Sequence, residues 1–163
     1  MIDTETLLTV YDSENADRIA IIKQLEESKD ERVVILFDSI LQNRSEDDLV
    51  RIEILKGLFL RRDILESRVR FAGTIRSILS SEDEDLVRQF AAKAMRSYID
   101  LDGAVDLLER LVKSENEDIA VRYSALAAIE ANSSLASCQD ALRRLIYIPE
   151  LGRSAQRTLQ KLI

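Results

Sequence analysis

Acidic side chains are the commonest groups in this chain that could hold a metal ion or assist catalysis. They gather in short runs at residues 47–48 and 82–85, and carboxylate oxygens are the ligands that Mg²⁺ and Ca²⁺ prefer. Each run stands where a helix is predicted to begin, and no glycine-centred loop with alternating oxygen ligands accompanies it. Carboxylates at a helix start cap its free N–H groups and interact favourably with its dipole. The pattern therefore favours helix caps over a metal site.

Histidine is absent from the chain, and the single cysteine is Cys138. These counts exclude His-based catalytic triads, zinc sites built from thiolates and imidazoles, and His-carboxylate iron sites. Cys138 has no histidine to act as its base, and the nearby Asp140 disfavours a thiolate, so we expect Cys138 to have a packing role. No glycine-rich phosphate loop precedes a helix. We predict no catalytic residue, no metal and no cofactor, and therefore no enzyme.

Composition narrows the class of protein further. The formal net charge of −7 argues against a general nucleic-acid binder, which needs a surplus of Lys and Arg on its contact face. The longest apolar run, residues 33–37, is far shorter than the ~20 residues of a membrane span, and the acidic start lacks the basic region of a signal peptide. Only four glycines and one proline are present. We expect one all-helical domain over residues 1–163, without a membrane segment, in the cytoplasm.

An internal repeat organises these helices. The segments 50–58, 87–95 and 121–129 align without a gap, each opening on Val-Arg after an acidic turn. Weaker copies stand at 17–25 and 151–159. Other apolar stretches with helical spacing separate the copies, and a first helix is expected around residues 4–11. The remaining stretches are 33–41, 69–79, 105–112 and 135–148. Each unit is then two helices, which gives about ten helices in five hairpins.

The pattern Val-Arg-x-x-Ala-x-x-Ala-Leu after an acidic turn resembles the HEAT-like repeats, especially the short units of bilin lyases and many bacterial regulators. The resemblance covers most of the chain and is strongest at residues 81–130. It departs at the two ends, where Asp17 replaces an apolar residue and Gly152 replaces the arginine. It implies an all-α fold, an α-solenoid of about five antiparallel helical hairpins stacked in a HEAT-like superhelix.

Small residues recur at one repeat position, as Gly57, Ala94 and Ala128. A bulky side chain there would hold neighbouring helices apart, because protein interiors are close-packed. We therefore expect close helix contacts at these three positions.

A basic residue also recurs at one place in successive repeats. In HEAT-like proteins such arginines pair with acids from the turns and form an internal ladder, so the resemblance implies a structural role rather than ligand contact. The expected ladder consists of Arg51, Arg88 and Arg122 with Asp47, Glu84 and Asp118 at the matching acidic positions.

The residue after each repeat arginine and the one four later share the opposite helix face, which lines the concave surface in HEAT-like stacks. Four of the five repeats carry a cation there, although the whole chain is acidic. Either these cations are solvated charges that align by chance, or they line a groove that binds an acidic or helical partner. We favour the groove. Ile52 and Tyr123 would be its apolar anchors. The expected partner-binding residues are Lys23, Ile52, Lys56, Gln89, Lys93, Tyr123, Arg153 and Arg157.

The leading hypothesis is a protein-interaction scaffold, adaptor or regulatory subunit that binds another protein on this concave face. The alternative is a bilin-lyase-like chaperone subunit or a HEAT-like DNA-binding enzyme. The absence of tryptophan and the net charge of −7 count against base excision, and nucleic acid is not the expected partner. The chain ends at 161–163 inside an amphipathic helix, so a homodimer through the C-terminal end is a third possibility.

Overall fold

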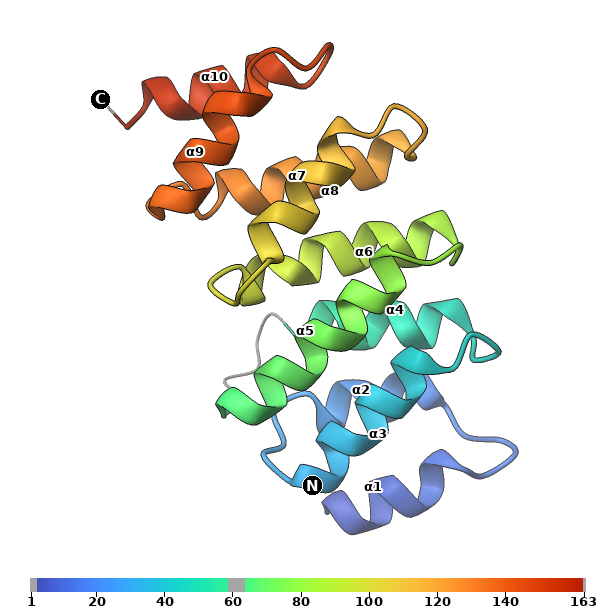
Figure 1. Ribbon diagram of the computed structural model, residues 1–163. Coiled ribbons are helices and arrows are strands. Elements are labelled where there is room, and N and C mark those ends of the chain that lie inside the picture. The colour runs from blue at the N-terminus through green and yellow to red at the C-terminus, as the bar shows by residue number, and fades with distance from the viewer. Residues whose placement is uncertain (1–2, 59–63, 163) are drawn as a thin grey trace. The chain divides into compact units, whose positions relative to one another are not determined.

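The computed structural model describes residues 3–58 and 64–162, and this part of the chain is all-helical (Figure 1). It contains ten α-helices, one short 3₁₀ turn at Arg96–Tyr98 and no strand. The α-helices are α1 Thr4–Tyr11, α2 Arg18–Leu25, α3 Glu31–Gln42, α4 Asp48–Gly57, α5 Leu65–Leu79, α6 Asp85–Met95, α7 Ala104–Lys113, α8 Ile119–Glu130, α9 Ala136–Leu145 and α10 Gly152–Gln160. The prediction of an all-α protein is confirmed.

Aspartates begin several of these helices, as the acidic turns predicted. The Asp47 carboxylate accepts a hydrogen bond from the Leu49 N–H at 2.7 Å at the start of α4. Asp118 does the same for α8, where it accepts from Ala120 at 2.8 Å and from Val121 at 3.2 Å. Such caps satisfy N–H groups that have no partner inside the helix.

The chain groups into two compact units, Met1–Thr74 and Ile75–Ile163. In the first unit α2 packs against α4 and α1, and α3 packs against α4. The core of this unit is mostly aliphatic with a few aromatic rings, and its fully buried members include Ile22, Leu25, Val33, Phe37, Leu41, Ile54, Leu58 and Phe71. An ion pair between Arg32 and Glu5 adds a link from the start of α3 to α1.

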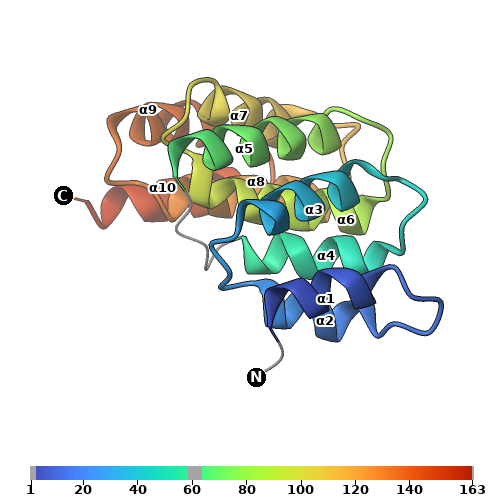
Figure 2. The ribbon, with the colours of Figure 1, turned by 90° about the horizontal axis from the view of Figure 1, so that it is seen from below.

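The second unit has two layers of helices. Helices α6, α8 and α10 lie side by side in one layer, with α7 and α9 in the other (Figure 2). Helix α8 packs against α6, α7, α9 and α10. The buried side chains between the layers include Val87, Ala91, Met95, Leu108, Val112, Val121, Ile129, Leu142 and Leu145.

Close packing at the small-residue position is confirmed. Ala94 and Ala128 are almost fully buried. A Cβ added to Gly57 would lie 2.8 Å from the Glu26 Cγ, so the side chain of Glu26 occupies the space that a larger residue would need.

Gly152 occupies the position where other repeats have an arginine, and close packing against the preceding turn explains the glycine. A Cβ at this position would lie 2.1 Å from the Ile146 carbonyl oxygen, so no side chain fits without moving backbone. The Gly152 N–H itself donates to the Ile148 carbonyl at 2.8 Å. The start of α10 therefore meets the preceding turn through the main chain.

Candidate interaction surface

Three of the repeat arginines reach back to the end of the helix before their own. In each case a guanidinium nitrogen donates to a backbone carbonyl in the last turn of the preceding helix, where carbonyls lack intrahelical partners and positive charge is favourable. The pairs are Arg51 Nη2 with Leu41 O at 3.1 Å, Arg88 Nη2 with Leu79 O at 3.1 Å, and Arg122 Nε with Val112 O at 3.0 Å. These arginines fasten the two helices of a hairpin together.

The acids that meet the arginines differ from those expected. Arg88 donates two hydrogen bonds to the Glu117 carboxylate at 2.7 and 2.6 Å, and these bonds raise its pKa. In the first unit, Arg18 pairs with Glu46 at 2.9 Å. Glu117 and Glu46 each belong to the acidic turn of the following hairpin and stand one residue before the cap of the next helix.

The expected ladder acids Asp47, Glu84 and Asp118 instead occupy the N-cap positions of α4, α6 and α8. Asp47 and Asp118 direct their carboxylates to N–H groups of their own helices, while the Glu84 side chain makes no cap hydrogen bond. Asp118 still adds to the negative charge near Arg88. A carboxylate at the N-cap lies closest to its own helix, so the residue before it is the one free to reach the neighbouring arginine.

In the first unit two of the expected cations share one carboxylate, which partly neutralises them. Lys23 and Lys56 both lie beside Glu53, with N–O distances of 3.6 and 3.1 Å. Ile52 is only 3% exposed. It belongs to the core, because α2 and α3 cover much of α4, and the expectation that Ile52 is a surface anchor is wrong.

In the second unit the expected cations remain available. Lys93, Arg153 and Arg157 are exposed, and no carboxylate of residues 3–58 or 64–162 forms an ion pair with them. The Lys93 ammonium lies 4.3 Å from the centroid of the Phe90 ring, a cation–π contact that steadies the side chain without neutralising it. Arg157 Nε donates to the Arg153 carbonyl at 3.3 Å.

Tyr123 lies on the helix between these cations and is half exposed. Because α8 is packed by four neighbouring helices, its exposed side chains point to the one side that remains open. Ala127, one turn further along α8, is exposed as well, and its small side chain protrudes little from this side of the helix. We call this surface the α6–α8–α10 face, and its members are Gln89, Lys93, Tyr123, Ala127, Arg153 and Arg157.

Two exposed apolar side chains beside this face were not predicted. Leu86 is 51% exposed and Ile119 is 42% exposed, each in the first turn of its helix. Both follow directly on an acidic turn and stand just before a Val-Arg pair, and an apolar residue at this place was the signal that could have identified them.

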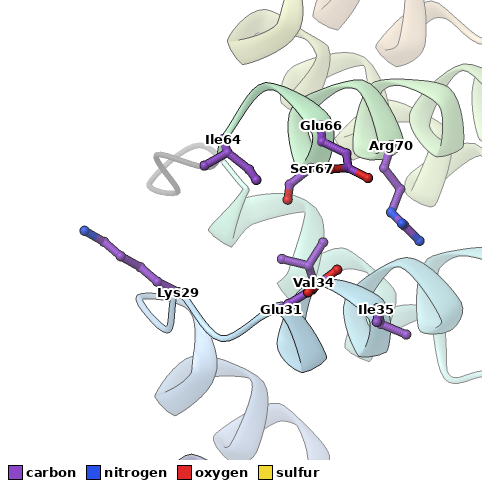
Figure 3. A pocket seen from close by; sticks show the side chains of 8 residues that line it. All are labelled: Lys29, Glu31, Val34, Ile35, Ile64, Glu66, Ser67 and Arg70. Atoms are coloured by element: carbon purple, nitrogen blue, oxygen red, sulfur yellow. The ribbon is translucent and has the colours of Figure 1, made fainter.

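A separate cleft of about 220 Å³ opens in the first unit, with α3 on one side and α5 on the other (Figure 3). Val34, Ile35 and Ile64 make its apolar part. Two cations and two carboxylates also line it, so its charge favours neither sign. The lining residues are Lys29, Glu31, Val34, Ile35, Ile64, Glu66, Ser67 and Arg70.

No family model matches this chain, and neither a curated protein nor a solved structure matches it. The HEAT-like resemblance stays a prediction. Within the part of the chain that the structure describes, no helix is long and apolar enough to cross a bilayer, and no three acidic, His or Cys side chains are placed to share a metal ion.

Proposed function

We propose that this protein is a protein-interaction module, a scaffold or regulatory subunit that binds a partner protein on the α6–α8–α10 face. Its fold would be an α-solenoid of about five antiparallel helical hairpins of the HEAT-like kind, for which a continuous binding surface is typical. The repeated contacts of Arg51, Arg88 and Arg122 support such a stack, since each joins the helices of one hairpin in the same way.

One observation carries the choice of surface. Lys93, Arg153 and Arg157 stand without ion pairs to the described residues around the exposed ring of Tyr123, in a chain of net charge −7. Four other basic groups in this unit, Arg88, Lys113, Arg143 and Arg144, form ion pairs with acids, as Arg144 does with Glu109 at 2.7 Å. A partner that brings negative charge would supply what this face lacks, and complementary charge steers association and selects partners.

The ion pairs of the first unit reduce the surface that the sequence predicted to its second-unit part. Glu53 already holds Lys23 and Lys56, so a partner would have to compete with it for those cations. The proposal therefore gives the main binding role to Lys93, Tyr123 and the α10 arginines. We also propose that the protein works in the cytoplasm, because the free, buried thiol of Cys138 suits a reducing compartment.

The test is capture of partners from the host by the tagged protein, compared with the double variant Lys93→Glu with Arg157→Glu. The matched control is Arg110→Glu with Arg143→Glu. These two arginines are also exposed and also lie in the last turn of their helices, but on α7 and α9 in the other layer. Both double variants change the net charge equally.

We expect the control to retain the partner and the face variant to lose about tenfold or more in affinity, because attraction becomes repulsion at two points. Circular dichroism should show the same helix content for both variants. Equal capture by the face variant and the wild type, confirmed with the purified partner by calorimetry, would refute the choice of surface.

A further inference from the structure

The partner's chemistry can be read from the order of side chains across the α6–α8–α10 face, and this step rests on the proposed function. Helices α6, α8 and α10 lie side by side and run in the same direction (Figures 1 and 2). Equivalent repeat positions therefore line up across them. One row is Gln89, Tyr123 and Arg153, and the next row is Lys93, Ala127 and Arg157.

The two outer helices of this face carry the positive charges, and the central helix between them carries apolar side chains. Lys93 lies on α6, and Arg153 and Arg157 lie on α10. The central helix contributes Tyr123 and Ala127 to the two rows and exposes Ile119 one turn before Tyr123. Its carboxylate at Glu130 accepts a hydrogen bond from Thr158 on α10 at 3.2 Å. Packed helices are roughly 8–10 Å apart, so the backbones that carry Lys93 and Arg157 are roughly 16–20 Å apart.

We propose that this face binds an extended acidic segment of the partner protein, in which an apolar side chain packs on Tyr123 and a carboxylate lies on either side of it. An extended chain advances about 3.3 Å per residue, so the two carboxylates are about five or six residues apart in the partner. One meets Lys93 and the other meets Arg157 or Arg153.

A helical segment fits the two rows less well. A helix rises 1.5 Å per residue and would need carboxylates roughly eleven to thirteen residues apart to span the same distance. A single nucleic-acid strand would need several stacking rings, and Phe90 already lies beside the Lys93 ammonium.

The experiment is a selection from a displayed library of random peptides about 14 residues long, which holds both spacings. The peptides are selected on the wild-type protein and depleted on Lys93→Glu with Arg157→Glu. We expect enriched peptides to carry two acids about five or six residues apart around an apolar residue. A synthetic peptide of this pattern should weaken about two- to fivefold for each acid replaced by its amide, measured by fluorescence anisotropy.

Three results would overturn the inference: enriched peptides without flanking acids, acids at the helical spacing, or tighter binding of a single-stranded oligonucleotide than of the peptide. Tyr123→Ala should weaken the synthetic peptide without changing its salt dependence, and an unchanged affinity would remove the apolar anchor. If the partner captured from the host depends on Lys93 and Arg157 while the library result is negative, the inference fails and the proposed function stands. If capture is independent of both residues, the proposed function itself fails.

Discussion

The variant Arg88→Ala tests the contact that joins successive hairpins of the second unit. Arg88 and Glu117 are 13% and 8% exposed at their side chains, and two hydrogen bonds join them. In the variant the Glu117 carboxylate keeps the hydrogen bond from the Asp118 N–H at 3.0 Å but loses both bonds from Arg88. The Leu79 carbonyl loses the hydrogen bond that Arg88 donates to it. Breaking a buried pair costs ~3–5 kcal/mol. The partial exposure of Arg88 places the expected loss at the lower end, about 3 kcal/mol.

Urea unfolding followed by far-UV circular dichroism measures this loss. With a slope of about 1–3 kcal/mol per molar urea, the midpoint should fall by roughly 1–3 M. The control is Arg143→Ala, whose ion pair with Asp140 is 59% exposed at both side chains and should contribute under ~1 kcal/mol. Glu117→Gln in the Arg88→Ala background should recover part of the loss, because an amide is less costly to bury than an unpaired carboxylate. Equal midpoints for Arg88→Ala and Arg143→Ala would refute the structural role of Arg88.

Two further predictions concern single positions. Gly152→Ala should lower the melting temperature, because its Cβ would lie 2.1 Å from the Ile146 carbonyl oxygen, whereas Gly73→Ala in open space on α5 should raise stability by up to ~1 kcal/mol. Calorimetry of both variants checks this contrast, and equal shifts would contradict it. Hydrogen bonds from Arg144 lower the pKa of Glu109, so this carboxylate stabilises the fold above its unfolded pKa of about 4.3 and the contribution is lost as pH falls through the lower folded value. Glu109→Gln should therefore flatten the decline in stability below about pH 4, as followed by urea unfolding at several pH values.

The helices could be predicted because Val-Arg after an acidic turn is a local pattern that fixes a helix start and a core position. The cations of the second unit could be placed on one face for the same reason. The acids that meet the arginines could not be assigned, because Glu117 and Asp118 are adjacent carboxylates and only the fold decides which one caps α8. Ile52 was misplaced because its burial depends on the neighbouring helices rather than on its own repeat position.

The ion pairs of Lys23 and Lys56 with Glu53 were missed for a related reason. Glu53 lies three residues before Lys56 on the same helix, which the spacing alone could suggest, but its approach to Lys23 joins two helices. Sequence periodicity identifies the face on which a charge lies. It does not identify the opposite charge that a neighbouring helix brings to it.

The acidic turn at residues 114–118 has a consequence for how this protein can change in length. Glu117 must reach Arg88 on one side, and Asp118 must cap α8 on the other. A residue inserted between them would separate the two carboxylates, and one of the two contacts would be lost. Loops elsewhere tolerate insertions at small entropic cost, so natural length variation in this region is expected outside the 117–118 step. A designer who extends the protein should likewise copy this turn unchanged.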